Sequence, residues 1–144
     1  INRLGIVQYT SSDADYISAR YQYRDSDSFI HIAAIPWKWL LTAKSRLRIT
    51  ETPNSGVVVG FVPDFDFDVF VANIDKTSGT RIEYFDMSGN WINQSTGKSG
   101  GGFAIFNLPE DTHEIVVISK STERIHSQVV PVDANSLSVL SFLE

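Results

Sequence analysis

The chain has 144 residues, of which 42% are hydrophobic and 20% charged, with a formal net charge of -5. This length is typical of one domain, and the composition is that of a globular protein rather than a disordered one. Cysteine is absent, which excludes disulfides, thiolate metal sites and cysteine nucleophiles. The apolar runs are far shorter than the roughly 18–20 residues that a membrane-spanning helix needs, so we expect no transmembrane segment.

Charge is distributed unevenly along the chain. Residues 1–55 carry seven basic and five acidic residues, a net charge of +2, whereas residues 56–144 carry five basic and twelve acidic residues, a net charge of -7. An acidic chain lacks the clustered positive charge that phosphate-backbone binding requires, so nucleic acid is not an expected partner. The exception lies within residues 38–48, where Lys44, Arg46 and Arg48 alternate as on the solvent-facing side of a strand.

Alternating hydrophobic and polar residues predict strands in the first third of the chain. Turn-forming residues separate these segments, and the three strands are typical of an antiparallel meander. The predicted strands cover residues 4–9, 16–24 and 29–35.

The segment that follows Pro36 fits two structures. In a short helix, Trp37, Leu40 and Leu41 have the spacing of one helical face, with Pro36 in the first turn. In a strand, Trp37 and Trp39 would share one face with Leu41. The sequence leaves both possibilities open.

The rest of the chain is also predicted to be β. A short strand is expected at residues 46–50, with Leu47 and Ile49 facing inward, and residues 52–56 form a strong break. We therefore predict an all-β protein, an antiparallel β-sandwich with little or no helix. Eight further strands are predicted at residues 57–62, 67–74, 80–85, 91–92, 103–108, 114–119, 124–132 and 137–142.

The stretch Gly100–Val117 carries a Gly-x-Phe motif that leads into the strand beginning at Phe103, followed by the turn Asn107-Leu108-Pro109 and an alternating strand. In these features it resembles the carboxypeptidase regulatory-like domains, which have a transthyretin-like (prealbumin-like) β-sandwich. Residues 57–71 look like the first two strands of that family, and residues 84–90 look like its Asp-x-x-Gly turn. The turn glycine of the family is replaced by Asp111, and a glycine loop replaces the usual Thr-Asp before the Gly-x-Phe strand.

The resemblance covers about residues 56–142 and implies a transthyretin-like sandwich in the C-terminal two-thirds. We expect Phe103, Ile105 and Ile115 in the core, and Gly102 where the backbone crosses a crowded edge. Asp111 can still adopt the left-handed conformation of that glycine, at some energetic cost. Domains of this family are mostly accessory: they brace a neighbouring domain, space a surface protein or bind a partner. Residues 1–55 either add strands to the domain at 56–144 or belong to a preceding β-domain.

Two acidic motifs are candidates for calcium. Asp64, Asp66 and Asp68 would line one face of a strand, either as ligands assisted by a loop or as charges that protect an edge strand. Asp86, Ser88 and Asn90 have the spacing at which a calcium loop begins, but the bidentate glutamate is missing, and a hairpin turn is the alternative. We expect neither motif to form a complete metal site.

No residue pattern indicates catalysis or a cofactor. Serine is abundant, but no Gly-x-Ser-x-Gly motif is present, and the glycines at 97–102 precede a strand rather than a helix. The three histidines lie far apart, which is typical of solvated or structural histidines. They are His31, His113 and His126.

The tryptophans are the more informative residues because they flank turns. Aromatic rings near loops either stack on sugars and anchor protein partners or cap the ends of a core. Rings surrounded by positive charge suit an acidic protein face or an anionic glycan. The predicted binding residues are Trp37, Trp39, Trp91, Lys44, Arg46 and Arg48.

These patterns favour a non-catalytic structural or protein-interaction module of a larger protein. The chain begins without Met and ends in Leu143-Glu144, so we expect a fragment. The alternatives are a carbohydrate-binding module that uses exposed tryptophans, and an accessory domain of an enzyme whose catalytic part lies outside the chain. The expected partners are neighbouring domains, another protein or a glycan. The β-rich, cysteine-free sequence favours a secreted, periplasmic or cell-surface protein.

Overall fold

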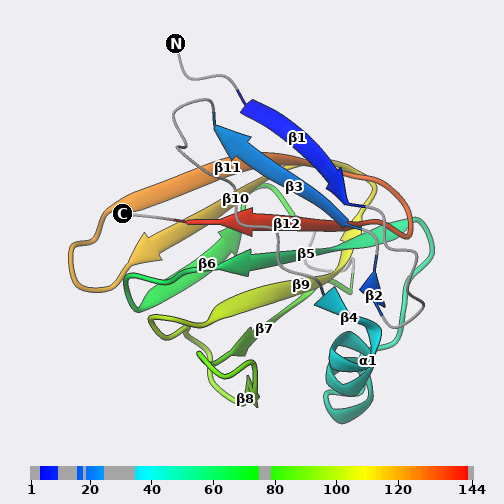
Figure 1. Ribbon diagram of the computed structural model, residues 1–144, viewed down its shortest axis with the longest axis horizontal. Coiled ribbons are helices and arrows are strands. Elements are labelled where there is room, and N and C mark those ends of the chain that lie inside the picture. Colours follow the sequence, from blue (N-terminus) through cyan, green and yellow to red (C-terminus); the bar gives the residue numbers. More distant parts are fainter. Residues whose placement is uncertain (1–3, 10–15, 18, 25–34, 75–78, 143–144) are drawn as a thin grey trace.

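A computed structural model shows two β-sheets packed face to face, with one short helix at the side (Figure 1). The structure describes residues 4–9, 16–17, 19–24, 35–74 and 79–142. The predicted all-β sandwich is confirmed. Most of the strand predicted at 29–35, together with His31, lies outside the described residues.

The larger sheet has seven strands and the smaller one has three. In spatial order, the large sheet consists of β1 (Leu4–Tyr9), β3 (Ala19–Arg24), β12 (Leu137–Ser141), β5 (Ser55–Phe61), β9 (Gly102–Pro109), β7 (Arg81–Phe85) and β8 (Trp91–Ile92). The small sheet consists of β11 (Ile125–Val132), β10 (Asp111–Ser119) and β6 (Phe67–Val71). A two-stranded ladder joins β2 (Tyr16–Ile17) and β4 (Ile35–Pro36), and α1 (Trp37–Arg46) follows β4.

The large sheet is not antiparallel throughout. Strand β12 runs parallel to β5, with Leu137 opposite Val57, and also parallel to β3, with Val139 opposite Tyr21. A parallel pair needs a long crossover, and the whole small sheet lies between β5 and β12 in sequence. The β1–β3 pair thus joins the same sheet as the C-terminal strands.

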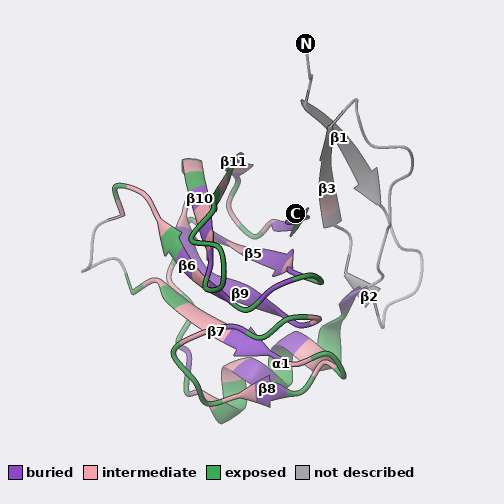
Figure 2. Cartoon of the chain, turned by 90° about the vertical axis from the view of Figure 1, so that its left-hand side faces the viewer, coloured by how far each residue is buried: buried purple, intermediate pink, exposed green. Residues whose placement is uncertain are grey.

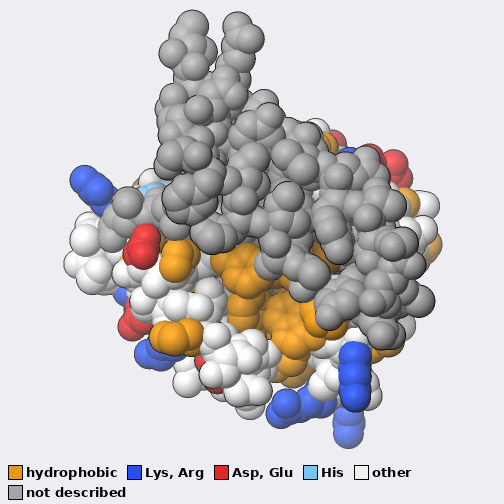
Figure 3. Space-filling view, in the orientation of Figure 1, with side chains coloured by type: hydrophobic (Ala, Val, Ile, Leu, Met, Phe, Trp, Pro, Cys, Tyr) orange, Lys and Arg blue, Asp and Glu red, His pale blue; other side chains and the backbone are white. Residues whose placement is uncertain are grey.

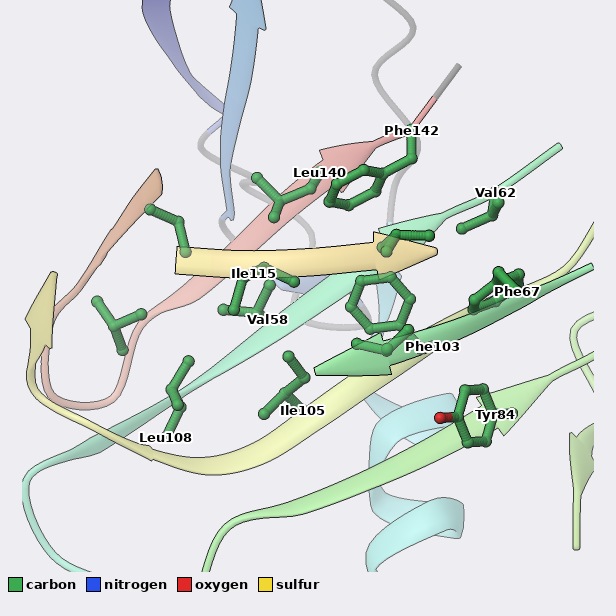
Figure 4. Packing of buried hydrophobic residues seen from close by; sticks show 14 of the residues in the cluster. Val58, Val62, Phe67, Tyr84, Phe103, Ile105, Leu108, Ile115, Leu140 and Phe142 are labelled. Atoms are coloured by element: carbon green, nitrogen blue, oxygen red, sulfur yellow. The ribbon is translucent and has the colours of Figure 1, made fainter. Parts of the chain in front are cut away.

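The main core fills the space between the two sheets (Figure 4). Phe103, Ile105 and Ile115 are fully buried there, as the sequence predicted. Alternation along β9 and β10 delivers these side chains to the inner faces of the two sheets. We call this group the inner core.

A second cluster covers the opposite face of the large sheet, and we call it the outer core. Ala104 and Phe106 of β9 are buried in it, so β9 is apolar on both faces. Helix α1 contributes Leu40 and Ala43, and its buried side faces the sheet near β7 and β8 (Figure 2). The sheet is therefore sandwiched on both sides over part of its area.

The strand predicted at 46–50 is wrong. Arg46 is the last residue of α1, and the chain then turns through Arg48, which adopts a positive φ of 53°. Ile49 is nevertheless buried in the outer core, and Leu47 is partly buried against it. Their inward orientation results from the turn after the helix rather than from a β ladder.

Two features of the Gly-x-Phe strand can be checked directly. A Cβ on Gly102 would lie 2.0 Å from the carbonyl oxygen of Gly60, so only glycine permits this close approach. Asp111 does not adopt the left-handed conformation open to it, because it begins β10 and its φ is not positive. Asn107 adopts it instead, with φ 58°.

Candidate functional site

Helix α1 carries four of the six predicted binding residues. Pro36, with φ -71°, precedes the helix, and Leu40 and Ala43 bury one side of it. Lys44 and Arg46 lie in the last turn, where positive charge complements the helix dipole. The helical alternative for this segment is therefore the correct one, and it decides where the tryptophans lie.

Trp39 and Trp91 form a structural stack. Their rings lie 4.5 Å apart between centroids at an interplanar angle of 26°. Trp39 Nε1 donates a hydrogen bond to Gly89 O at 2.7 Å, and Trp91 Nε1 donates to Trp39 O at 3.2 Å. Gly89 has the positive φ expected in its turn. Trp91 is buried and Trp39 half-buried, so the pair fastens α1 to the β7–β8 turn.

Trp37 lies on a different side of the helix. Residues two positions apart in a helix point about 200° apart around the helix axis. Trp37 and Trp39 therefore do not share a face, as they would in a strand. Trp37 is 45% exposed, and Leu41, one turn later, is 55% exposed. On the helical wheel, exposed Lys38 lies about 60° beyond Leu41, and Lys44 lies about 20° from Trp37 on its other side. We call Trp37, Lys38, Leu41 and Lys44 the α1 patch.

A cavity of about 250 Å³ opens beside the α1 patch. Trp37, Leu40 and Lys44 line it from the helix. Val57, Phe106 and Leu137 add apolar side chains from the sheet. The remaining side chains carry hydroxyl or amide groups, apart from the ion-paired carboxylate of Glu51. The other polar lining residues are Thr52, Ser55, Asn107, Asn135 and Ser136.

Asn107 hydrogen-bonds with the segments that border this cavity, and it was not among the predicted binding residues. Its Nδ2 donates to Thr50 O at 2.7 Å, and its Oδ1 accepts a hydrogen bond from Thr52 N at 3.1 Å. Thr80 Oγ1 donates to Asn107 O at 2.9 Å. The Asn-Leu-Pro turn was the available signal, because asparagine is the residue most tolerant of a left-handed backbone after glycine.

Positive charge is concentrated on α1 and just after it, at Lys38, Lys44, Arg46 and Arg48. Lys44 donates a hydrogen bond to Glu51 and is thereby neutralised. Within the described part of the chain, none of the four ion pairs involves Lys38, Arg46 or Arg48. Lys and Arg side chains gather over α1 at the lower right of the molecule, next to an apolar surface (Figure 3). This region therefore differs in sign from the acidic chain as a whole.

The predicted site residues thus fall into separate groups. Trp37 and Lys44 line the cavity, whereas Trp39, Trp91 and Arg46 line a shallow depression that also includes Lys38. Arg48 follows the helix and is exposed. Leu41 was not among the predicted binding residues, although its helical spacing from Trp37 was visible in the sequence.

The acidic motifs serve as turn-formers in the structure. Asp64 and Asp66 are exposed and Asp68 is partly buried, and of the three only Asp68 lies in β6. Asp66 Oδ1 accepts a hydrogen bond from Ser99 N at 2.8 Å. Asp86 Oδ1 accepts from the amides of Ser88 and Asn90 at 3.0 and 2.9 Å, which closes the expected hairpin turn. In residues 4–142, outside the masked gaps, no three His, Asp or Glu side chains form a metal-binding group.

The described histidines and Tyr84 lie in structural environments. His113 Nε2 hydrogen-bonds with Pro109 O at 2.7 Å. The imidazole of His126 stacks on the ring of Phe65 at 5.1 Å. Burial in the inner core raises the pKa of the Tyr84 phenol above its usual value, and the nearby Asp68 carboxylate adds to this effect. A hydrogen bond with the Val69 backbone acts in the opposite direction.

Comparison with known proteins gives no family assignment. No family model, curated protein sequence or solved structure matches this chain. Among the described helices, none has the length and apolar character needed to cross a bilayer.

Proposed function

We propose that this chain is a non-catalytic interaction module of a larger secreted or cell-envelope protein. Its α1 patch contacts an acidic surface of a neighbouring domain or of another protein. The observation that carries the proposal is the exposure of Trp37 and Leu41, 45% and 55%, on a helix whose other side is anchored in the core.

Physical chemistry favours this surface for binding. Tryptophan is among the residues that contribute most when buried at an interface, because it removes a large apolar area from water. The nearby cations that form no ion pair within the described residues would attract an acidic partner and repel a basic one. The stack of Trp39 on Trp91 fixes α1 against the sheet, so Trp37 is held on a rigid support.

The polar side chains support a non-catalytic role. Asn107, Asp86 and His113 each hydrogen-bond with backbone groups of a turn. Asp66 likewise holds the amide of Ser99. Groups engaged in fixed turns are positioned for stability rather than for proton transfer to a substrate. The resemblance to carboxypeptidase regulatory-like domains points to the same accessory role.

A glycan is the second candidate ligand. Trp37 borders a cavity that also carries the hydroxyl groups of Ser55 and Ser136 and the amide of Asn135. An indole stacks on the apolar face of a sugar ring, and such polar groups hydrogen-bond its hydroxyls. An anionic sugar would additionally suit the cations of α1.

The test places a photo-cross-linking amino acid at Leu41 of the full-length parent protein in its native cells. The matched control carries it at Ile125, which is 70% exposed on the small sheet. We expect a discrete protein conjugate from position 41 and none of the same mass from position 125. Trp37→Ala and Lys38→Glu should each weaken binding of the identified partner by roughly tenfold or more.

Two other results would change the assignment. If positions 41 and 125 give the same conjugates, or neither gives any, the α1 patch is not the contact surface. If a glycan array shows binding that Trp37→Ala abolishes and Trp39→Phe retains, the glycan replaces the protein as the ligand.

A further inference from the structure

The four edges of the two sheets are protected to different degrees. An unpaired strand edge presents free N–H and C=O groups, and proteins blunt such edges with short strands, charges, proline or covering contacts. Three of the four edges carry such a device, whereas the residues that the structure describes provide none for β1. We infer that β1 is the pairing edge through which two copies of this chain associate.

The three protected edges are easily recognised. Strand β8 has only two residues. In β6, Phe67 exchanges backbone hydrogen bonds with Gly97 at 3.1 and 2.8 Å, which covers the start of the strand. Strand β11 carries Pro131, which has no N–H to donate.

Strand β1 differs in length and composition. It has six residues, Leu4–Tyr9, and none of them is charged or proline. In the described part of the chain it pairs only with β3, through six residue pairs from Leu4–Arg24 to Tyr9–Ala19. Figure 1 shows β1 as the outermost strand of the sheet. In an antiparallel pair, successive residues alternate in bonding direction, so half of its backbone groups point away from β3.

The charge pattern favours a second copy as the occupant. The charged residues of β1 and β3 are Arg20 and Arg24, and both lie in β3. Arg20 is also neutralised by Asp133, at 2.8 Å. When β1 pairs with its symmetry mate, two uncharged strands separate the arginines of one copy from those of the other. The separation is three strand spacings, about 14 Å, beyond the Debye length of about 8 Å at physiological ionic strength.

A two-fold axis is compatible with β1 in two registers. In an antiparallel pair, directly opposed residues have the same bonding direction. When a two-fold axis relates the two strands, one residue must therefore lie opposite its own copy, and the axis passes between these two residues. Near the centre of the strand, Ile6 or Val7 then lies opposite its own copy. Such a contact is isologous and closes as a dimer, and it continues the large sheet across both chains. A six-residue edge buries less than a standard interface of about 1,200–2,000 Å², so the dimer is a weak one.

The test measures the mass of the protein by sedimentation equilibrium from micromolar to millimolar concentration. We expect a reversible monomer–dimer equilibrium. Hydrogen exchange at the two extremes should show alternate β1 amides becoming protected only at high concentration, while the others are protected at both. A monomer throughout, or a dimer with unchanged protection of β1, would overturn the inference.

Charged substitutions at the two candidate positions of the two-fold axis provide the decisive test. Lysine or glutamate replaces Ile6 in one pair of variants and Val7 in a second pair. At the position on the axis, the lysine and glutamate variants should each be monomeric, and mixing them should restore a mixed dimer. Circular dichroism identifies a variant that fails to fold, and the other position then decides the outcome.

Ile125→Lys, on the edge strand β11, is the matched control and should leave dimerisation unchanged. Trp37→Ala should also leave it unchanged, so this inference and the proposed role of the α1 patch are tested separately. If neither mixed pair regains dimer while the unsubstituted chain dimerises, the contact lies elsewhere and β1 is not the pairing edge.

Discussion

The two faces of the large sheet bury similar side chains but are covered in different ways. The inner face packs against a second sheet, whereas the outer face is covered in part by the short helix α1. Strand β9 supplies both, with Phe103 on the inner side and Phe106 on the outer side, each fully buried. Because both faces of the large sheet are covered, β9 is apolar on both sides and shows no alternation. Helix α1 covers the outer face only in part, and its own exposed side is available for binding.

The largest expected effect tests the inner face. Phe103→Ala should lower the free energy of unfolding by about 3–5 kcal/mol, because it leaves a cavity between rigid sheets. Phe103 also packs on Gly60, where a Cβ would come within 2.2 Å of its ring. Chemical denaturation of the variant beside Phe106→Ala measures both faces. A loss below about 1 kcal/mol for Phe103→Ala would contradict its place in the core.

The second prediction concerns the attachment of the helix. Leu40→Ala should cost about 2–3 kcal/mol, at the lower end for a buried leucine, because a surface helix can shift to reduce the cavity. It should also weaken the near-ultraviolet circular dichroism of the Trp39–Trp91 stack. Leu41→Ala, one residue further and exposed, is the control and should change stability by less than about 0.5 kcal/mol. Equal losses for the two variants would show that α1 does not dock as described.

The sequence predicted the inner face better than the outer face, for a physical reason. Period-two alternation in residues 103–108 and 114–119 marks a strand with one face toward a core, and it located Phe103, Ile105 and Ile115 correctly. The outer core joins Leu40 and Ile49 to Val59 and Phe106. These contacts link a helix, a turn and two strands that lie far apart in sequence. The periodicity of hydrophobic residues within one segment does not predict such contacts.

The candidate site shows the same limit. Seven residues from Trp37 fit a helix and a strand equally well, and only the burial of Leu40 and Ala43 against the sheet selects the helix. In the helix, Trp37 and Trp39 lie on different faces. Lys44 and Arg46 also lie on the helix instead of on one face of a strand. The polar lining of the cavity comes from four segments, so its members could not be grouped from sequence.

The third prediction compares the two tryptophans of α1. Trp39→Phe removes the 2.7 Å hydrogen bond to Gly89 O and should cost about 1–1.5 kcal/mol. Within the described residues the Trp37 indole forms no hydrogen bond for Trp37→Phe to remove, so this variant should stay within about 0.5 kcal/mol of the parent chain. Thermal unfolding of the pair measures the difference. If Trp37→Phe were the more destabilising change, Trp37 would be a core residue and the α1 patch would lose its anchor.

The smallest effect appears only in alkaline solution and concerns the inner core. Tyr84 is the ionisable member of that cluster, and burial followed by the charge of Asp68 raises its pKa in the folded state. In the unfolded chain the phenol titrates near its ordinary value of about 10. The contribution of Tyr84 to stability is therefore fully present below that value.

As the pH rises above about 10, the unfolded chain loses its proton first, and this contribution declines until the folded-state pKa is reached. We expect the parent chain to lose more stability than Tyr84→Phe between about pH 9 and 11, since the variant has no phenol to ionise. Urea unfolding of both proteins across this range isolates the Tyr84 contribution, because the remaining lysines and tyrosines titrate in both. Parallel stability curves would mean that the phenol reaches solvent, and the inner face of β7 would then be less tightly closed than the packing around Phe67 and Phe103 indicates.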